Sequence, residues 1–163
     1  MSTDVETAPL PSADDVRGLL NGLFDRAVTV QQEDHPALRG KDVHVVGSYV
    51  DDAAQLRAVV FCDLALGNVL GAALALVPPP RVQEALETGA VLGDLADNTR
   101  EVLNVVASMF NHAGAHLKLK DTWVVPEPVA DDVVGFLREP CRRVDLRVDV
   151  AGYGEGLLVL LLR

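Results

Sequence analysis

Cysteine and positive charge are scarce in this sequence of 163 residues. The two cysteines, Cys62 and Cys141, form no cluster with metal-ligand spacing, and no signal peptide precedes the fold. We therefore expect two reduced thiols in a cytoplasmic protein. Lys and Arg total 14 against 24 Asp and Glu, which gives a formal net charge of -10. This balance argues against broad contact with nucleic-acid phosphates and fits a protein that docks on a basic partner surface.

Long apolar runs are also missing, because no stretch reaches the length that a membrane span requires. The longest candidates are residues 64–77, which two glycines and an asparagine interrupt, and residues 157–162. We predict a buried helix for the first and a buried strand for the second. Hydrophobic residues nevertheless make up 49% of the chain, which is enough for one domain with a real core. Residues 1–11 are predicted to be a flexible tail, and residues 12–163 a single domain.

Two parts of the chain, about 12–63 and 93–163, share one order of predicted elements: helix, strand, variable connection and hairpin. The first part has a predicted helix over 13–27, capped by Ser12, and strands over 28–30, 43–50 and 56–62. The second part has a helix over 93–113 ending near Gly114, a strand over 116–125, a short helix over 130–137 and strands over 142–150 and 157–162. A glycine-rich turn over 152–156 is expected to join the last two strands.

A predicted helix over 64–76, capped by Asp63 and stopped by three prolines, separates the two parts. A short amphipathic turn over 81–87 follows it. The doubled order predicts an α+β fold of two layers, in which helices cover a mostly antiparallel sheet.

The helix over 93–113 carries a narrow polar stripe opposite a wide apolar face. The stripe, which we name the polar ridge, consists of Asp97, Glu101, Asn104, Ser108 and Asn111. These side chains fall within roughly 80° of the helix surface at 3.6 residues per turn. The default interpretation is an ordinary solvated face. Such faces, however, favour Lys, Arg, Glu and Gln, whereas this one holds two Asn, which is a mediocre helix former, and no positive charge. The pattern alone leaves both interpretations open.

The run Asp97-x-x-x-Glu101-x-x-Asn104 resembles the signature of the CheC/CheX family of response-regulator phosphatases. That signature has Asp or Ser, then Glu four residues later, then Asn three residues after that. The apolar and small residues after Asn104 are similar to those of the family, and the doubled element order resembles the family's internal repeat. In architecture the resemblance covers residues 13–163, whereas in letters it covers a short part of one helix.

The resemblance implies a phosphatase that removes the phosphoryl group from the aspartate of a CheY-like response regulator. Asn104 would orient a water for in-line attack on phosphorus, Glu101 would pair with the partner's lysine, and Asp97 would support the motif. Ser108 and Asn111 would extend the contact with the partner. The Mg²⁺ would belong to the partner, and the chain would need no metal or cofactor of its own. These roles fit the chemistry, because phosphoryl transfer depends mainly on positioning and charge compensation.

Some family members carry the motif twice, once in each half. Asp14, Gly18 and Asn21 stand at the same spacing in the first helix, with Gly18 where the Glu would be. This is either a decayed second site or a chance spacing. A chain with one complete motif resembles the CheX branch, whose members pair as homodimers. Dimerisation through sheet edges would also protect exposed strand edges.

Other residues suggest different chemistry less strongly. Ser108 and His112 lack an acid that would orient the imidazole of a nucleophile pair. His112 and His116 have a spacing that can hold a metal on a helix, but Gly114 is predicted to end the helix between them. The glycines over 152–156 join two strands and precede no helix, so a hairpin turn is favoured over a phosphate loop.

Two other classes of function stay open. The resemblance extends to flagellar-switch proteins that only bind partners, so a non-catalytic receiver-binding or scaffold module is the main alternative. An unrelated small-ligand-binding domain would need a concave apolar pocket with converging polar groups, and no residue pattern indicates one.

Overall fold

The structure, a computed structural model, describes residues 9–112 and 116–163, apart from the side chain of His112. Most of the predicted tail and the predicted helix end at Gly114 therefore lie outside the described residues. The helices are α1 (Ala13–Phe24), α2 (Leu64–Ala75), α3 (Pro80–Thr88), α4 (Gly93–His112) and α5 (Asp131–Arg138), with a 3-10 turn, η2 (Gly40–Asp42). The strands are β1 (Val28–Gln32), β2 (Val43–Val50), β3 (Leu56–Asp63), β4 (Lys118–Val124), β5 (Arg142–Val150) and β6 (Gly154–Leu162). Within these residues, no helix has the length and apolar character needed to cross a membrane.

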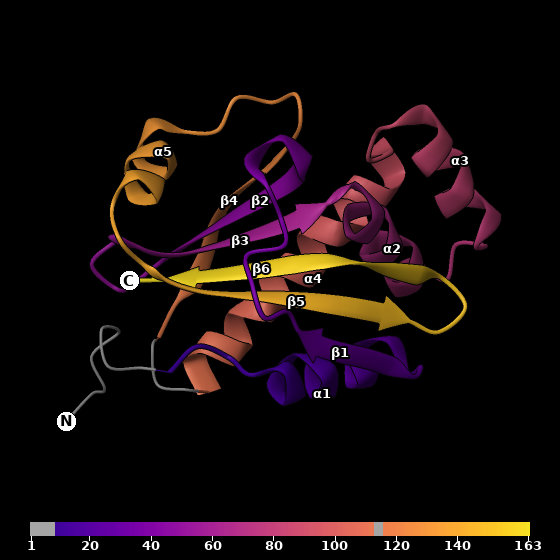
Figure 1. The fold of residues 1–163 in the computed structure, drawn as a ribbon, viewed down its shortest axis with the longest axis horizontal. Coiled ribbons are helices and arrows are strands. Elements are labelled where there is room, and N and C mark those ends of the chain that lie inside the picture. The colour runs from indigo at the N-terminus through magenta and orange to yellow at the C-terminus, as the bar shows by residue number, and fades with distance from the viewer. Residues whose placement is uncertain (1–8, 113–115) are drawn as a thin grey trace.

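The strands form one antiparallel sheet in the order β1-β5-β6-β3-β2-β4 (Figure 1). Each half supplies a hairpin to the centre of the sheet, β2–β3 or β5–β6. The first strand of each half pairs with the hairpin of the other half, so β1 lies beside β5 and β4 lies beside β2. Exchanging the two halves reverses the order of the strands and changes nothing else. The predicted doubling and the antiparallel α+β fold are confirmed.

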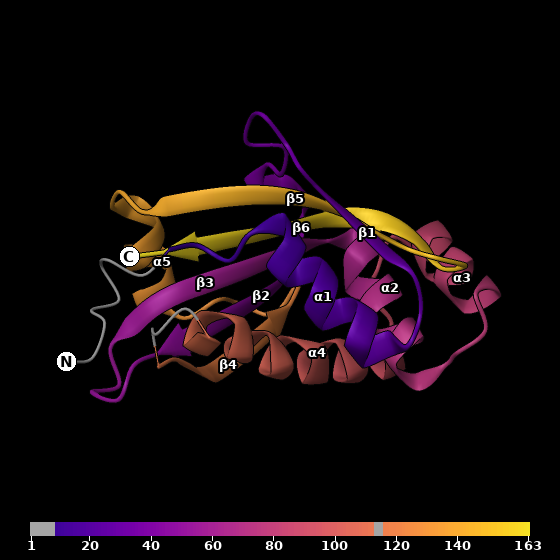
Figure 2. The same cartoon turned by 90° about the horizontal axis from the view of Figure 1, so that it is seen from below.

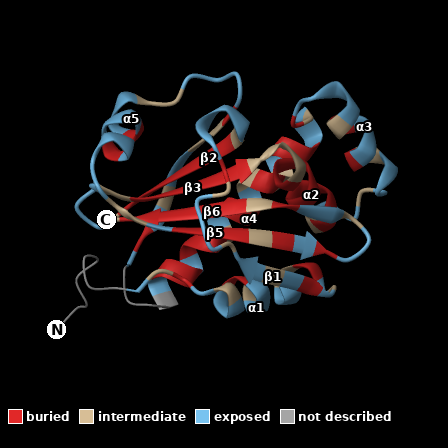
Figure 3. Cartoon of the chain, in the orientation of Figure 1, coloured by how far each residue is buried: buried red, intermediate tan, exposed pale blue. Residues whose placement is uncertain are grey.

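Alternate strand residues point to opposite faces of the sheet, and each face has its own core. The larger core joins residues such as Val45, Tyr49 and Leu160 to α1, α2 and α4. The smaller core joins Phe61 and Leu161, among others, to α5. Figure 2 shows α1 and α4 side by side on one side of the sheet, and Figure 3 shows the central strands buried along most of their length. The helices thus cover one face fully and the other only at one end.

The glycines of α2 bring its backbone against that of α4. A side-chain carbon at Gly71 would overlap the carbonyl oxygen of Leu95, so only glycine fits at this contact. One turn earlier, the hydroxyl of Thr99 donates a 2.6 Å hydrogen bond to the carbonyl of Gly67. The buried Asn68 accepts a hydrogen bond from the amide of Leu92 and so fixes the entry to α4. The apolar run 64–77 is the buried helix that its composition predicts. The residues that interrupt the run, Gly67, Asn68 and Gly71, are the ones that contact α4 and its entry.

Two local predictions are corrected. The turn of the last hairpin is shorter than residues 152–156, because β6 already begins at Gly154. Gly156 belongs to the strand, where a side-chain carbon would come within 2.5 Å of the amide nitrogen of Leu66 in α2. Residues 81–87 are part of the helix α3 rather than a turn, since Pro80 occupies its first turn, where proline is tolerated.

A buried carboxylate holds the β1–β2 connection against β5. Asp145 is only 4% exposed, and its side chain accepts hydrogen bonds from Arg143 and from the amides of Ala37 and Leu38. Burial opposes ionisation, but these hydrogen bonds, with that of Arg143 the strongest, outweigh it and lower the pKa of Asp145. Strand periodicity did not predict this contact, because a charged residue at an inward position interrupts the apolar pattern.

We predict that Gly71→Ala lowers the free energy of unfolding by about 1–3 kcal/mol or more, because the methyl group must push α2 and α4 apart. Gly22→Ala in α1 is the matched control. A side-chain carbon at Gly22 meets nothing within 4 Å, so this variant should be neutral or slightly stabilising. Urea unfolding followed by circular dichroism compares the two, and equal midpoints would contradict the packing assigned to Gly71.

Asp145→Asn should destabilise the protein by about 3 kcal/mol at pH 7, because it leaves Arg143 without its buried partner. The pKa of Asp145 is lower in the folded state than in the unfolded chain. Its stabilisation is therefore complete above the unfolded pKa of about 3.9 and is lost as the pH falls through the folded value. The difference in unfolding free energy should shrink below about pH 4. The exposed Asp149→Asn serves as control, and a difference independent of pH would refute the assignment.

Candidate functional site

All five residues of the polar ridge are exposed along α4. The opposite face of the helix packs into the larger core through Val102, Leu103, Val106 and Phe110. The helical spacing therefore separates a solvent-facing polar stripe from a buried apolar face. A helix packed in this way presents its polar side chains from a rigid backbone.

The start of the ridge is tied to the connection between β4 and α5. Arg100 donates to Asp97 at 2.9 Å and to Glu127 at 2.9 Å, so one guanidinium bridges the two carboxylates. Glu127 also accepts a hydrogen bond of 3.3 Å from the amide of Val124, at the end of β4. Asp97 thus has a partner within the chain, which fits a supporting position better than a reacting one.

The far end of the ridge is also bonded internally. The hydroxyl of Ser108 donates to the carbonyl of Val105 at 2.7 Å. The side-chain oxygen of Asn111 accepts a hydrogen bond from the amide of Leu117 and so joins α4 to the start of β4. Both residues lie where a partner could reach them, but Asn111 has a structural role that its spacing did not reveal.

Glu101 and Asn104 differ from the other three ridge residues. Neither side chain has a hydrogen bond or ion pair within residues 9–112 and 116–163, and both are exposed. Residues three apart on a helix have Cβ atoms about 5–6 Å from each other, so one partner can meet both. The structure therefore leaves an acidic acceptor and a neutral carboxamide side by side and free for intermolecular contact.

The internal repeat assigns Asn21 to a different counterpart from the one that its motif spacing suggests. Val28 of β1 pairs with Val150 at the end of one hairpin, and Lys118 of β4 pairs with Val50 at the end of the other. The first strands of the two halves, β1 and β4, are therefore offset by 90 residues, from 118 minus 28. This shift places Asn21 on Asn111.

Asn21 and Asn111 also have the same structural role, which is to join a helix to the strand that follows it. Asn21 accepts a 2.8 Å hydrogen bond from the amide of Val28 and so joins α1 to β1. The same shift places Asp14 on Asn104, and the position equivalent to Glu101 precedes α1. In this alignment Asp14 and Asn21 do not stand opposite Asp97 and Asn104. A decayed second site over Asp14 and Asn21 stays a prediction.

Tyr49 of β2 supports the ridge from below. It is fully buried, and its hydroxyl donates a 2.6 Å hydrogen bond to the carbonyl of Leu103, the residue before Asn104. Its ring lies 5.4 Å from that of Phe110. Burial raises the pKa of Tyr49 well above its ordinary value, so the hydroxyl stays a donor. Sequence reasoning missed this residue, because no local pattern links position 49 to position 103.

A groove of about 420 Å³ runs between α1 and α4 beside the ridge. Asp14 and Asp15 line it from α1, and Ser108 and Met109 line it from α4. Together with Glu101, these carboxylates make the surface around Asn104 acidic. Such a surface favours a partner with basic side chains.

Both alternative sites suggested by the histidines involve His112. The side chain of His112 and residue Gly114 lie outside the described residues. In the part of the chain that is described, no group of three His, Cys, Asp or Glu residues is placed to hold a metal ion.

No protein-family model and no curated protein matches this chain. Solved structures match along nearly its whole length. One is the chemotaxis protein CheX from Vibrio vulnificus, with a TM-score of 0.56 and 13% identity over 99% of this chain and 100% of that chain. Another is the CheX-CheY-BeF3-Mg complex from Borrelia burgdorferi, with a TM-score of 0.51 and 12% identity over 90% of this chain and 91% of that chain. A third is the FliM middle domain from Vibrio alginolyticus, with a TM-score of 0.59 and 13% identity over 92% of this chain and 87% of that chain.

The chain has a CheC/CheX-like fold. The resemblance inferred from one helix motif and the doubled element order is therefore confirmed for the architecture. At identities of 10–13% the likeness concerns the fold alone, so the roles of individual residues rest on their geometry. In this CheC/CheX-like fold, the ridge lies on the first helix of the second half, and Figure 2 shows that helix, α4, running along one side of the sheet.

We predict that Tyr49→Phe lowers the free energy of unfolding by about 1 kcal/mol, because the buried carbonyl of Leu103 loses its side-chain donor. Tyr153→Phe is the control. The ring of Tyr153 stacks on Arg26, and its hydroxyl has no hydrogen bond in the described residues. Thermal unfolding of both variants measures the difference. Equal loss in both would mean that the Tyr49 hydroxyl does not hold α4.

Proposed function

We propose that this protein is a phosphatase that acts on the phospho-aspartate of a CheY-like response regulator, in chemotaxis or another two-component pathway of the cytoplasm. The observation that carries the proposal is the state of the polar ridge. Of its five residues, Asp97, Ser108 and Asn111 are bonded within the chain. The two that the CheC/CheX motif would use in catalysis, Glu101 and Asn104, are exposed and have no hydrogen bond or ion pair with any residue that the structure describes.

In the proposed mechanism Asn104 enters the partner's active site and positions the attacking water. Its carboxamide oxygen accepts a hydrogen from the water, while its NH₂ group donates to a neighbouring oxygen. The group carries no charge, so it can approach an anionic phosphoryl group without repulsion. Alignment of a nucleophile accounts for a large share of the barrier in reactions of this kind. The hydrogen bond from Tyr49 to the adjacent carbonyl keeps the helix rigid at this point.

Glu101 is proposed to bind a lysine beside the partner's phosphoryl group and so to fix the docking register. The acidic groove beside Ser108 and the net charge of -10 both favour a partner whose contact surface is basic. The Mg²⁺ is proposed to come with the partner. The Borrelia burgdorferi structure, which holds CheX, CheY, BeF3 and Mg together, supports a receiver as the class of partner.

A non-catalytic receiver-binding or scaffold module is the second candidate. The FliM middle domains share this fold with TM-scores up to 0.59, and two of the matched structures are complexes of FliM with SpeE and with FliG. A partner-binding module would use the same exposed ridge without orienting a water. The two candidates therefore differ in rate acceleration and not in binding.

We also propose that the protein forms a homodimer through a sheet edge. The edges are β1 and β4, and β4 is a strand of seven residues with unpaired backbone groups on its outer side. Size-exclusion chromatography with light scattering gives the mass, and a monomer at high concentration would exclude this part of the proposal.

Asn104→Ala should slow dephosphorylation by about 10²–10³-fold, as expected when one positioning group is lost. The assay follows phosphate release from acetyl-phosphate-charged receivers of the same genome. Gln83→Ala is the control, because Gln83 is an exposed carboxamide on α3, a helix that carries no residue of the ridge. Its rate should stay close to that of the wild type.

Glu101→Ala should weaken binding to the receiver and also lower the rate of dephosphorylation, since it removes the docking carboxylate. Acceleration that survives both Asn104→Ala and Glu101→Ala would refute this mechanism. Tight binding of a receiver without any acceleration by the wild type would favour the scaffold module instead.

A further inference from the structure

The sheet face opposite α4 is only partly covered. In the second half, α5 fills the connection between the first strand and the hairpin. In the first half, the equivalent connection between β1 and β2 contains only the short turn η2. The two halves of the sheet therefore differ in the elements that cover this face. Apolar side chains of β2, β3 and β6 belong to the smaller core on this face.

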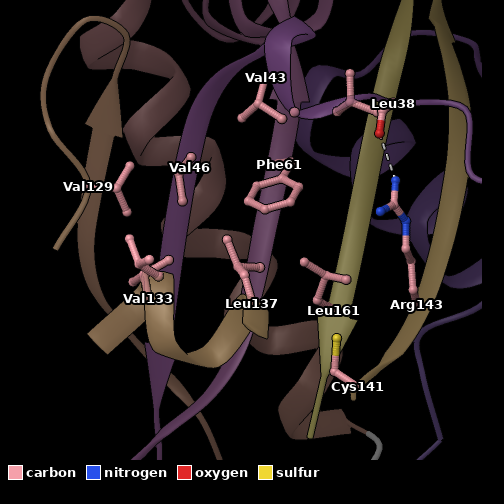
Figure 4. A pocket seen from close by; sticks show the side chains of 12 residues that line it. Leu38, Val43, Val46, Phe61, Val129, Val133, Leu137, Cys141, Arg143 and Leu161 are labelled. Carbon is pink, nitrogen blue, oxygen red and sulfur yellow. Dashed lines mark hydrogen bonds between the residues drawn. The ribbon is translucent and has the colours of Figure 1, made fainter. Parts of the chain in front are cut away.

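This gap is a cleft of about 460 Å³, which we name the apolar cleft. That volume falls within the range of roughly 300–1,000 Å³ typical of small-molecule sites. Figure 4 shows strand residues forming the floor, α5 forming one wall and the β1–β2 connection forming the other. The floor is Val46, Phe61 and Leu161, and the walls include Val133 and Leu38.

The walls of the cleft are anchored, so the cleft is preformed. Arg163 at the C-terminus stacks on the ring of Phe136 at 4.1 Å and forms a 3.3 Å ion pair with Glu139, which holds the end of α5. On the other side, the amides of Ala37 and Leu38 are bound by Asp145. A ligand would therefore enter without a large ordering cost.

The rim exposes apolar side chains that a ligand would cover. Val134 is 37% exposed and Leu137 is 43% exposed, and both line the cleft from α5. Large apolar side chains at the mouth of an apolar cleft favour a ligand with an aliphatic part, because binding of that part removes apolar surface from water.

The charged groups that line the cleft are of one sign. Although the protein has a net charge of -10, the lining described here has no carboxylate, and its one charged residue is Arg143. Arg143 uses Nε and Nη2 for Asp145 and the carbonyl of Leu38, and no described residue binds its Nη1. Asp145 lies behind the lining, and its charge is already engaged by the amides of Ala37 and Leu38. Two guanidinium hydrogens thus remain for an anionic or carbonyl oxygen.

We propose that the apolar cleft binds an aliphatic monocarboxylate, with its chain on Val46, Phe61 and Leu161 and its carboxylate at Nη1 of Arg143. This site lies on the opposite sheet face from the polar ridge and does not depend on the proposed phosphatase function. Sequence reasoning found no pattern for such a pocket, because its lining comes from β2, β3, β5, β6, α5 and the connections between elements.

Isothermal titration calorimetry with decanoate, below its micellar concentration, tests the proposal. We expect saturable binding of one decanoate per chain, weaker binding of decanol and no binding of decyltrimethylammonium. Leu137→Glu, which places a carboxylate at the rim, should weaken decanoate binding at least tenfold. Leu76→Glu is the matched control, since Leu76 is 67% exposed and does not line the cleft. Equal affinity for all three amphiphiles, or equal loss in both variants, would overturn the proposal.

A cysteine gives an independent readout at the site. Cys141 lines the cleft and is partly exposed, whereas Cys62 is fully buried. A thiol reagent such as 5,5′-dithiobis(2-nitrobenzoic acid) should therefore react with Cys141, and saturating decanoate should slow that reaction at least severalfold. Unchanged reactivity under saturation would contradict the assigned site. Co-sedimentation with phosphatidylglycerol vesicles in place of decanoate binding would identify a membrane surface and overturn the proposal as well.

Discussion

The contact between Gly71 of α2 and the carbonyl oxygen of Leu95 in α4 is the constraint on which the functional surface depends. Because no side chain intervenes there, α4 can lie close across α2 and still reach β2. Thr99 and Tyr49 then fix the rotation of α4 about its axis through hydrogen bonds to the backbone of α2 and from the sheet. The distance of α4 from α2 and its rotation about its own axis are both set, and together they determine which residues of α4 are exposed. The placement of Glu101 and Asn104 is thus a result of glycine packing on the hidden side of the helix.

Hydrogen bonding separates structural from available polar groups within one helix face. Asp97 is held by Arg100, and Asn111 accepts from the start of β4. Both could have been taken for site residues on spacing alone. Glu101 and Asn104 are exposed and bond to no other residue in the described part of the chain, so their polar groups are available to a partner. Availability of this kind is a property of contacts and could not have been obtained from residue types.

Local patterns predicted most elements, and long-range contacts explain what they missed. Hydrophobic periodicity, the Ser12 and Asp63 caps and the proline breaks placed the helices and strands within a few residues. The length of the turn in the last hairpin was predicted wrongly, because Gly156 is required by close packing against α2, which lies far away in the sequence. For the same reason the roles of Tyr49, Asn111 and the apolar cleft were not predicted. Each depends on segments that only the folded topology brings together.

The exchange of first strands between the two halves has a consequence for how the chain is made. Val28 pairs with Val150, so β1 has no neighbouring strand until the residues of β5 have been synthesised. The first strand of each half completes its pairing only with the hairpin of the other half. Folding of the shared sheet must therefore wait for contacts of high sequence separation.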